Sequence, residues 1–377
     1  WLPSESRRCA DRGRRPPAAA RSAPGRRKAA AQPAAEPGYV GHSLTDSRNG
    51  AEAVHPTVDA IPDELRRELA TRAGIDIAAL RPVRVIAASH SELAEWALPS
   101  AEGPATLLIK RVVRTRDPEK ARARLIREHD ALRALAQRLG PELAGTIPTI
   151  IAAAPGELAL AMSRLPGTPL SRILRRDANR LTGWIRGARA RTAMVQVGTW
   201  LARFQAATRT EPVPHDHEAF VAAVAHQLDR ITAVHPRDSL QPLLHAATEA
   251  SRALVGSPLP AAGRHGDFLP QNVLVDGRRI GVVDFENYES RGVAFDDPGA
   301  FLGYLAMLEA RRAYSPRALR KAREGFLQGY GVDPDLPAFR LYAFLGALTV
   351  TADSPRRGDP GMRRRLVELG REWIPRP

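Results

Sequence analysis

The sequence is most informative at residues 265–285, which read HGDFLPQNVLVDGRRIGVVDF. This stretch predicts a loop that carries Asp267, a short strand that begins at Asn272, and a second short strand that ends at Asp284. Asp276-Gly277 between the two strands is a strong hairpin signal. We therefore predict that the chain folds back on itself and brings the Asp284 carboxylate beside the Asn272 amide, next to the carboxylate of Asp267.

These three side chains suit one kind of chemistry. Carboxylate and amide oxygens are ligands that Mg²⁺ prefers, and Mg²⁺ keeps water and phosphate oxygens at its other positions. A neighbouring carboxylate can orient an alcohol and accept its proton during phosphoryl transfer. The alternative is an ordinary loop and hairpin with solvated acids.

The same positions resemble the catalytic and metal-binding motifs of the aminoglycoside phosphotransferase and choline kinase-like family, a phosphotransferase enzyme family with a protein-kinase-like fold. The resemblance covers roughly residues 80–350 and is sharp only at 265–284. It implies ATP and Mg²⁺ as cofactors and a hydroxyl of a small molecule as acceptor. It also implies that Asp267 is the catalytic base and that Asn272 and Asp284 bind magnesium.

A second part of the chain agrees with this resemblance. Lys110 ends an apolar, strand-like run, and Glu128 follows eighteen residues later on a helix predicted at 118–139. The resemblance implies that Lys110 holds the nucleotide phosphates and that Glu128 holds the lysine. Glu119 and Asp130 remain alternative partners, and ordinary surface charges would give the same letters.

Two further segments would contact the nucleotide. The turn predicted at 88–92 has no glycine, and Ser89 and Ser91 there could donate to a phosphate, although a plain polar turn is equally compatible with the sequence. The resemblance also places an inter-lobe hinge near Met162, where backbone groups of Ser163 and Leu165 would bind adenine. A strand end followed by a turn would look identical.

We assign structural roles to two other polar residues near the motif and leave the role of a third undecided. By the resemblance, His265 fixes the catalytic loop, and Asp297 caps the helix that follows it and braces that loop. Glu286 could reach a second metal or the substrate, or be an exposed loop acid. His215 and His217 are expected in a solvated loop and not at a metal site.

The order of elements predicts an α+β protein with a two-lobed, protein-kinase-like fold. Three strand-like runs and a helix come first, and mainly helical patterns follow from residue 193. We divide the chain into a disordered basic tail at 1–58, a nucleotide-binding N-lobe at 59–162, and a C-lobe with the catalytic loop, metal site and substrate pocket at 163–377.

Composition narrows the functional class. Of the net charge of +15, residues 1–28 contribute +7, from nine basic and two acidic residues, so the charge lies largely in a solvated tail or in upstream sequence translated in error. Without zinc-finger spacing or aromatic-rich basic motifs, we expect no nucleic-acid partner.

No uncharged apolar run reaches about 18 residues, so we expect no membrane span. The single cysteine, Cys9, excludes an internal disulfide, and the cytoplasm is the default location. A chain that starts at Trp1 is expected to be a fragment or to have a misassigned start.

Two other functions remain open, a protein kinase and a catalytically silent binding module. Gly266 stands where many protein kinases carry an arginine that reads a phosphorylated loop. Only twelve residues separate Asp284 from Asp297, which leaves little room for a peptide platform. A small substrate is therefore favoured. The mixture of acids and arginines in the C-terminal third does not favour a strongly cationic substrate, and the chain has few aromatic residues for a cage around a quaternary amine. A sugar, an amino alcohol or another neutral hydroxyl compound fits at least as well. The oligomeric state stays open.

Overall fold

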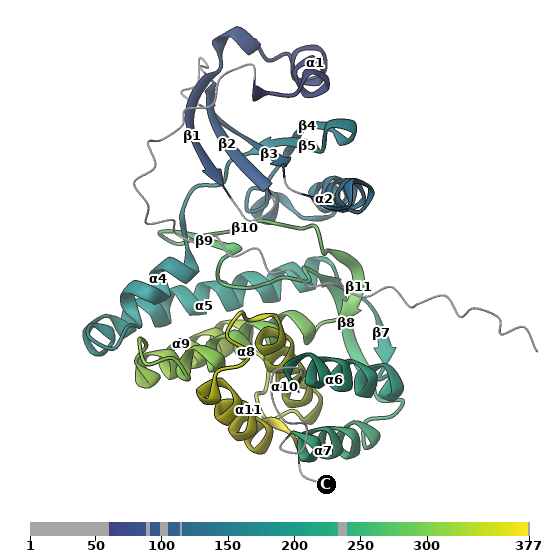
Figure 1. Ribbon diagram of the computed structural model, residues 1–377, viewed down its shortest axis with the longest axis vertical. Helices are drawn as coiled ribbons and strands as arrows, with labels where there is room; N and C mark the ends of the chain where they lie inside the picture. The colour runs from purple at the N-terminus through teal and green to yellow at the C-terminus, as the bar shows by residue number, and fades with distance from the viewer. Residues whose placement is uncertain (1–59, 88–90, 99–104, 114, 233–239, 376–377) are drawn as a thin grey trace, which may run out of the picture. The chain divides into compact units, whose positions relative to one another are not determined.

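The computed structural model describes residues 60–87, 91–98, 105–113, 115–232 and 240–375 (Figure 1). The predicted tail at 1–58 and Ser89 lie outside these residues. All described residues belong to one compact unit, Val40–Pro377. The domain boundary that we placed after residue 162 stays a prediction.

A five-stranded antiparallel sheet forms the first part of the fold, in the order β1-β2-β3-β5-β4. Its strands are β1 (Arg81–Ala87), β2 (Ser91–Leu98), β3 (Ala105–Val112), β4 (Ile150–Ala154) and β5 (Ala159–Ser163). The sequence predicts strands at 83–88, 93–98, 106–113 and 157–162, which match β1, β2, β3 and β5 to within two residues at each end. It missed β4, because an apolar run of five residues rich in alanine has little strand character of its own.

The two faces of β3 explain the position of Lys110. Leu107 and Ile109 point to one face and are buried in a core that includes Leu65 and Leu69 of α1 (Asp63–Thr71). Side chains alternate along a strand, so Lys110 emerges on the opposite face. Figure 1 shows α2 (Pro118–Arg138) beside the same sheet.

Helix α2 presents a buried stripe to the rest of the fold. It begins where Asp117 accepts a hydrogen bond from the backbone N–H of Lys120 at 3.0 Å, with Pro118 at its first position. Leu125, Glu128 and Leu132 are all buried, at the three- and four-residue spacing of one helix face. The buried acid of this helix is therefore Glu128, whereas the side chains of Glu119 and Asp130 are exposed.

The second part of the fold is mainly helical. Its helices are α3 (Pro141–Ala144), α4 (Leu170–Asp177), α5 (Gly183–Ala207), α6 (His217–Thr232), α7 (Gln241–Arg252), α8 (Asp296–Glu309), α9 (Pro316–Tyr330), α10 (Pro337–Asp353) and α11 (Pro360–Trp373). Helices α5 and α9 approach closely, because a Cβ on Gly198 would lie 2.2 Å from the Phe326 carbonyl oxygen. One continuous apolar core joins most of these helices.

Two three-stranded sheets complete the fold. The first, in the order β10-β9-β6, contains β6 (Thr168–Pro169), β9 (Val273–Asp276) and β10 (Arg279–Val282). Its β9–β10 pair is the predicted hairpin, with Val282 paired to Val273. The second, in the order β11-β8-β7, contains β7 (Thr210–Pro214), β8 (Pro258–Arg264) and β11 (Glu289–Val293). The sequence missed these last three strands, since their prolines and glycines weaken the strand pattern.

The two-lobed α+β prediction is confirmed: a small antiparallel sheet lobe precedes a helical part. The solvated loop predicted for His215 is wrong. Its side chain is buried, with Nε2 2.7 Å from the Ser251 hydroxyl and rings of Phe220 and Tyr342 against it. Among the described helices, none is both long enough and apolar enough to cross a membrane.

Candidate active site

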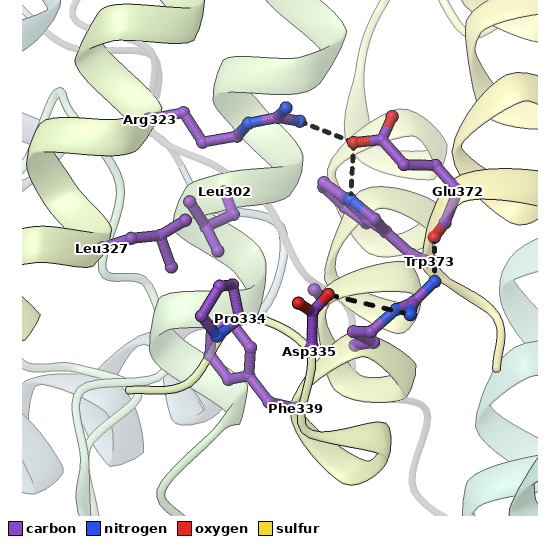
Figure 2. Close-up of a pocket in the computed structure, with 10 residues that line it drawn as sticks. Leu302, Arg323, Leu327, Pro334, Asp335, Phe339, Glu372 and Trp373 are labelled. Carbon is purple, nitrogen blue, oxygen red and sulfur yellow. Dashed lines mark hydrogen bonds and ion pairs between the residues drawn. The ribbon is translucent and has the colours of Figure 1, made fainter. Parts of the chain in front are cut away.

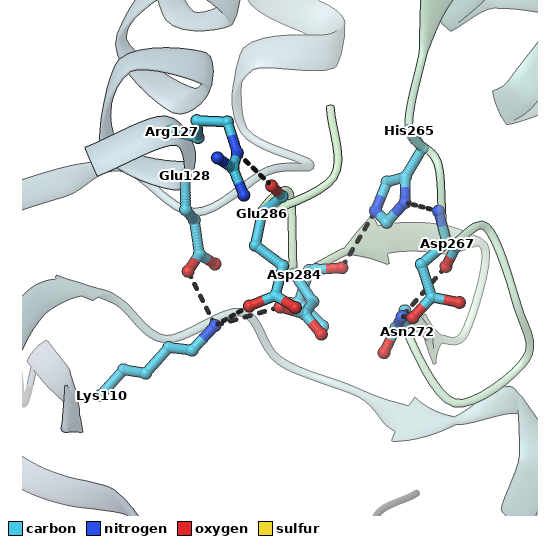
Figure 3. A network of polar contacts seen from close by, with 9 residues as sticks. Lys110, Arg127, Glu128, His265, Asp267, Asn272, Asp284 and Glu286 are labelled. Carbon is cyan, nitrogen blue, oxygen red and sulfur yellow. Dashed lines mark hydrogen bonds and ion pairs between the residues drawn. The ribbon is translucent and has the colours of Figure 1, made fainter. Parts of the chain in front are cut away.

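Lys110 is the centre of a buried charge cluster (Figure 3). Its ammonium lies 2.7 Å from a carboxylate oxygen of Glu128 and 3.0 Å from one of Asp284. A carboxylate oxygen of Glu286 lies 3.9 Å away. The cluster therefore joins β3, α2 and the segment after β10, and it confirms that the predicted lysine and helix glutamate meet.

The pKa values in this cluster are set by burial and by the one ammonium and three carboxylates that lie together. Burial alone would lower the pKa of Lys110, but the carboxylates of Asp284, Glu128 and Glu286 outweigh it and raise that pKa, so the lysine stays protonated. Burial raises the pKa of Glu128, and Lys110 opposes the shift. One ammonium among three carboxylates leaves a net negative charge, which attracts a further cation.

The loop after β8 holds Asp267 beside Asn272. The Nδ2 of Asn272 donates to Oδ2 of Asp267 at 2.9 Å and to its backbone carbonyl at 3.0 Å. The N–H of Val283 donates to the Asn272 carbonyl at 3.0 Å, which ties this loop to the residue before Asp284. The hairpin therefore brings residues 267, 272 and 284 into one region, as predicted (Figure 3).

His265 makes a second link between the loop and the hairpin. Its Nδ1 accepts from the N–H of Asp267 at 3.2 Å, and so its Nε2 carries the proton and donates to the Val283 carbonyl at 3.1 Å. Burial lowers the pKa of His265 to about 4, despite the Asp284 charge. The imidazole is therefore neutral near pH 7.

Asp297 contacts the same loop. Its carboxylate accepts hydrogen bonds from the backbone N–H groups of His265 at 2.7 Å and Gly266 at 3.0 Å. Burial raises its pKa to about 6, against the effect of these bonds and of Arg264. Our prediction that Asp297 caps the helix is wrong: α8 begins at Asp296, two residues before the predicted start at Pro298, and its N-cap residue Phe295 makes no side-chain cap. The carboxylate lies in the first turn and faces the loop instead.

Two backbone conformations shape this region. Gly266 has a φ of +80°, and a Cβ there would lie 2.4 Å from the Asn287 carbonyl oxygen. Asp284 has a φ of +72°, which is uncommon for a residue with a side chain and is typical of strained functional positions. The sequence showed neither conformation.

The predicted metal ligands suit a hard cation. Because Asn272 directs its Nδ2 to Asp267, its Oδ1 is the atom left for a cation. Asp284 supplies a carboxylate within the net negative cluster. The donor set therefore fits Mg²⁺. Among the described residues, no group of three or more His, Cys, Asp or Glu side chains forms a metal cage.

Three of the residues predicted to contact a nucleotide, Ser163, Leu165 and Ser91, lie in the described part of the chain. The N–H of Ser163 donates to the Thr149 carbonyl at 2.9 Å, at the end of β5. A Cβ on Gly281 of β10 would lie 3.1 Å from the Leu165 side chain, so the hinge packs on the hairpin. Ser91 is buried and is the first residue of β2, which begins two residues before the predicted strand.

Comparison with known proteins agrees with this geometry. Residues 100–345 match the model of the phosphotransferase enzyme family. The chain belongs to the phosphotransferase enzyme family. This confirms the family that the motifs resembled. No protein with a curated description matches the sequence of this phosphotransferase.

Solved structures that are similar to this phosphotransferase have low sequence identity to it. A glucosamine kinase in complex with glucosamine, ADP and inorganic phosphate is 17% identical, with a TM-score of 0.50, over 85% of this chain and 100% of that chain. A choline kinase from Cryptosporidium parvum Iowa II is 14% identical, with a TM-score of 0.49, over 82% and 94%. An ADP-bound aminoglycoside phosphotransferase is 16% identical, with a TM-score of 0.48, over 83% and 98%.

Sequence reasoning missed two sets of contacts in this phosphotransferase. Arg264 lies between Glu289 at 2.6 Å and Asp296 at 3.2 Å. Trp200 of α5 stacks on Phe268, the residue after Asp267, with ring centroids 5.7 Å apart. Trp200 was visible on the α5 pattern, but no periodicity could show that it supports the loop.

Proposed function

We propose that this phosphotransferase transfers the γ-phosphate of ATP to a hydroxyl of a small molecule, with Mg²⁺. The observation that carries the proposal is the contact of Lys110 with both Glu128 and Asp284, beside the Asn272–Asp267 hydrogen bond. Nucleotide-side and acceptor-side groups then share one site. The family supports a small-molecule phosphotransferase, and ATP, Mg²⁺ and the acceptor belong to the proposal.

On the nucleotide side, Lys110 binds phosphate oxygens and Glu128 holds its ammonium in place. The N–H of Ser163 is already bonded within the sheet, so the adenine edge uses other backbone groups, the Ser163 carbonyl and the Leu165 N–H. Ser91 and Ser89 complete the phosphate side through backbone or hydroxyl donors. The glucosamine kinase with the same fold contains ADP, which is consistent with nucleotide use.

On the acceptor side, Asp267 orients the hydroxyl and accepts its proton. Asn272 keeps the Asp267 carboxylate in one orientation through the 2.9 Å hydrogen bond. His265 and Asp297 hold the loop backbone, so their roles are structural. The proton leaves the hydroxyl as the oxygen attacks phosphorus, and the bond from phosphorus to the ADP oxygen breaks.

Asn272 and Asp284 would hold Mg²⁺ through Oδ1 and a carboxylate oxygen. When bound there, Mg²⁺ supplies positive charge to the phosphate oxygens. The net negative charge around Lys110 favours this binding.

The acceptor is a neutral or weakly charged hydroxyl compound. Acids that could recognise a polycation contact arginines: Glu289 and Asp296 contact Arg264, and Asp353 contacts Arg230 at 2.5 Å. Between Asp284 and α8 the chain forms β11, which pairs with β8, so the segment where protein kinases bind peptides is short and structured. Both features favour a small substrate. A cytoplasmic location stays a prediction.

The test is a screen for acceptor-dependent ADP release. Sugars, amino alcohols and hydroxylated antibiotics are supplied one at a time with ATP and Mg²⁺, and ADP is measured against the background without acceptor. We expect a neutral hydroxyl compound to raise ADP release well above background. Release that no hydroxyl compound increases would contradict the proposal.

A further inference from the structure

A groove of about 550 Å³ lies between the segment around α3, the middle of α5 and the β9–β10 hairpin. This volume is in the range of small-molecule sites. Its charged lining residues are Glu142, Arg203, Arg278 and Arg279, and the amide of Gln196 also faces it. The groove is formed by different residues from those of the candidate active site.

The groove carries a net positive charge. Glu142 forms an ion pair with Arg203 at 3.3 Å, which neutralises both. Among the residues that the structure describes, the guanidinium groups of Arg278 and Arg279 have no hydrogen-bond or ion-pair partner. Two guanidinium groups at one hairpin turn can each bind a phosphate or a carboxylate through paired N–H donors.

In a second pocket, the arginines already contact other groups of the protein (Figure 2). It has about 170 Å³ and lies among α8, α9, α10 and α11. There Arg323 contacts the Glu372 carboxylate at 3.0 Å, and Arg340 contacts the Glu372 carbonyl and lies 3.9 Å from Asp335. Its arginines are already used within the protein, whereas those of the hairpin are not.

The groove is connected to the catalytic loop and to the hairpin. The Thr146 carbonyl accepts from the N–H of Val282 at 2.8 Å, on the strand that leads to the proposed metal ligand. The Thr146 hydroxyl accepts from the Trp200 indole N–H at 2.9 Å. Trp200 in turn stacks on Phe268, next to the proposed base. Both Thr146 and Trp200 line the groove, so a ligand there touches residues that support both elements.

We propose that this groove binds a small polyanion, a compound with several phosphate or carboxylate groups, and that binding holds the β9–β10 hairpin against α5. Arg278 and Arg279 supply the charge, and Gln196 supplies a neutral donor. Occupancy then restrains β10, the strand that leads to the proposed metal ligand Asp284. The regulatory part rests on the proposed function, whereas the binding itself does not.

The binding test uses calorimetric titration of the full chain in the presence of excess ADP, so that the nucleotide site is filled. Pyrophosphate and benzene-1,3,5-tricarboxylate are the probes, and they distinguish phosphate from carboxylate selectivity. We expect at least one to bind, and Arg278→Gln/Arg279→Gln to weaken it about tenfold or more, because a charge-assisted hydrogen bond contributes about 1.5–3 kcal/mol. The control Arg317→Gln/Arg320→Gln removes the same charge from exposed positions of α9 and should bind like the wild type.

Hydrogen exchange locates the effect. The bound probe should slow exchange in β9 and β10 of the wild type and not of the hairpin variant. No binding of either probe, or equal affinity in the hairpin variant and the wild type, would overturn the proposal. Asp267→Asn should bind the probe as the wild type does, because the groove does not include Asp267. If the acceptor screen fails but the probe still binds in a way that depends on Arg278 and Arg279, the proposed function is refuted and the groove proposal is not. The thermal shift caused by ADP checks that each variant is folded.

Discussion

At the scale of single residues, the buried ammonium of Lys110 and the carboxylates of Glu128 and Asp284 compensate one another's charge. Its ammonium lies within 3.0 Å of Glu128 and of Asp284, and all three side chains are largely removed from water. A buried ion pair contributes little against an apolar pair of the same shape, but removal of one partner leaves the other charge uncompensated.

We therefore expect Lys110→Met to lower the free energy of unfolding by about 3–5 kcal/mol, because Glu128 stays buried without its ammonium. Lys110→Met/Glu128→Gln should recover a substantial part of that loss. Urea denaturation of the two variants and the wild type gives the comparison. Equal losses in the single and the double variant would show that the pair is not coupled.

The protonation of His265 predicts a pH dependence. Its folded pKa of about 4 lies below the ordinary 6.5, so its contribution to stability is fully present above pH 6.5 and is lost as the pH falls toward 4. Compared with His265→Gln, the wild type should lose up to about 3 kcal/mol over this window, since one pKa unit corresponds to about 1.4 kcal/mol.

Asp297 acts in the opposite direction. Because its pKa is raised to about 6, Asp297 adds stability as the pH falls from 6 toward 3.8. Asp297 is present in both the wild type and His265→Gln, so its contribution cancels when the free energies of unfolding of the two proteins are subtracted. The measurement is urea denaturation of both proteins at several pH values. A wild-type-minus-variant difference that does not change with pH would contradict the neutral, buried assignment of His265.

How far the site could be predicted differs between residues. The approach of Asp284 to Asn272 and Asp267 followed from the hairpin signal. The pairing of Lys110 with Glu128 came from the family resemblance, because the spacing alone left Glu119 and Asp130 as alternatives. The contact of Asp297 with the catalytic loop was expected from the resemblance, but its position inside the first turn of α8 was not, because an acid at a helix start can bond to its own helix backbone or to a neighbouring loop. Only the tertiary position of the loop decides that choice.

At the scale of elements, the catalytic loop requires glycine at one position. Gly266 combines a φ of +80° with a close contact, because a Cβ on this residue would lie only 2.4 Å from the carbonyl oxygen of Asn287. Gly277, in the hairpin turn, has a φ of +58°, and a Cβ there would meet open space. The two glycines therefore separate backbone conformation from steric contact.

We expect Gly266→Ala to lower the free energy of unfolding by about 3 kcal/mol or more and to disturb the loop that holds Asp267. The matched control Gly277→Ala should lose only about 1 kcal/mol, because it has the conformational penalty without the contact. Thermal denaturation of both variants measures the difference. Similar losses would mean that the loop can move to admit a side chain.

Helices and strands were predicted well where a proline or glycine marks their ends, and poorly where such residues lie inside them. The sequence predicts helices at 118–139, 316–328, 337–352 and 362–373. They match α2, α9, α10 and α11, each of which begins at a proline, to within two residues at each end. Strand β8 escaped prediction because Pro258, Pro260 and Gly263 interrupt it, and its pairing to β7 and β11 is supplied by distant parts of the chain.

At the scale of the whole molecule, the described core begins with α1, whose Leu65 and Leu69 are buried in the sheet lobe. The preceding stretch is basic and rich in alanine and proline, without a hydrophobic period. The helical part depends on close contacts such as Gly329 against the Val195 carbonyl, which no local pattern reveals.

We expect deletion of residues 1–55 to leave a folded and active core, because α1 and its partners are retained. The Tm should change by only about 2 °C or less, since every core residue that the structure describes is retained. Calorimetry and the acceptor assay check this outcome. Loss of folding would show that the domain boundary is misplaced.

The central claim is that one site moves phosphate from ATP to a hydroxyl, with Asp267 as base. The most direct measurement follows ³¹P NMR of ATP, Mg²⁺ and an acceptor found in the screen, with the wild type and with Asp267→Asn. We predict a phosphomonoester signal and ADP with the wild type, and a rate lower by about 10²–10⁴-fold with the variant, which still binds ADP. Inorganic phosphate as the only product, or equal phosphomonoester formation by both proteins, would contradict the account.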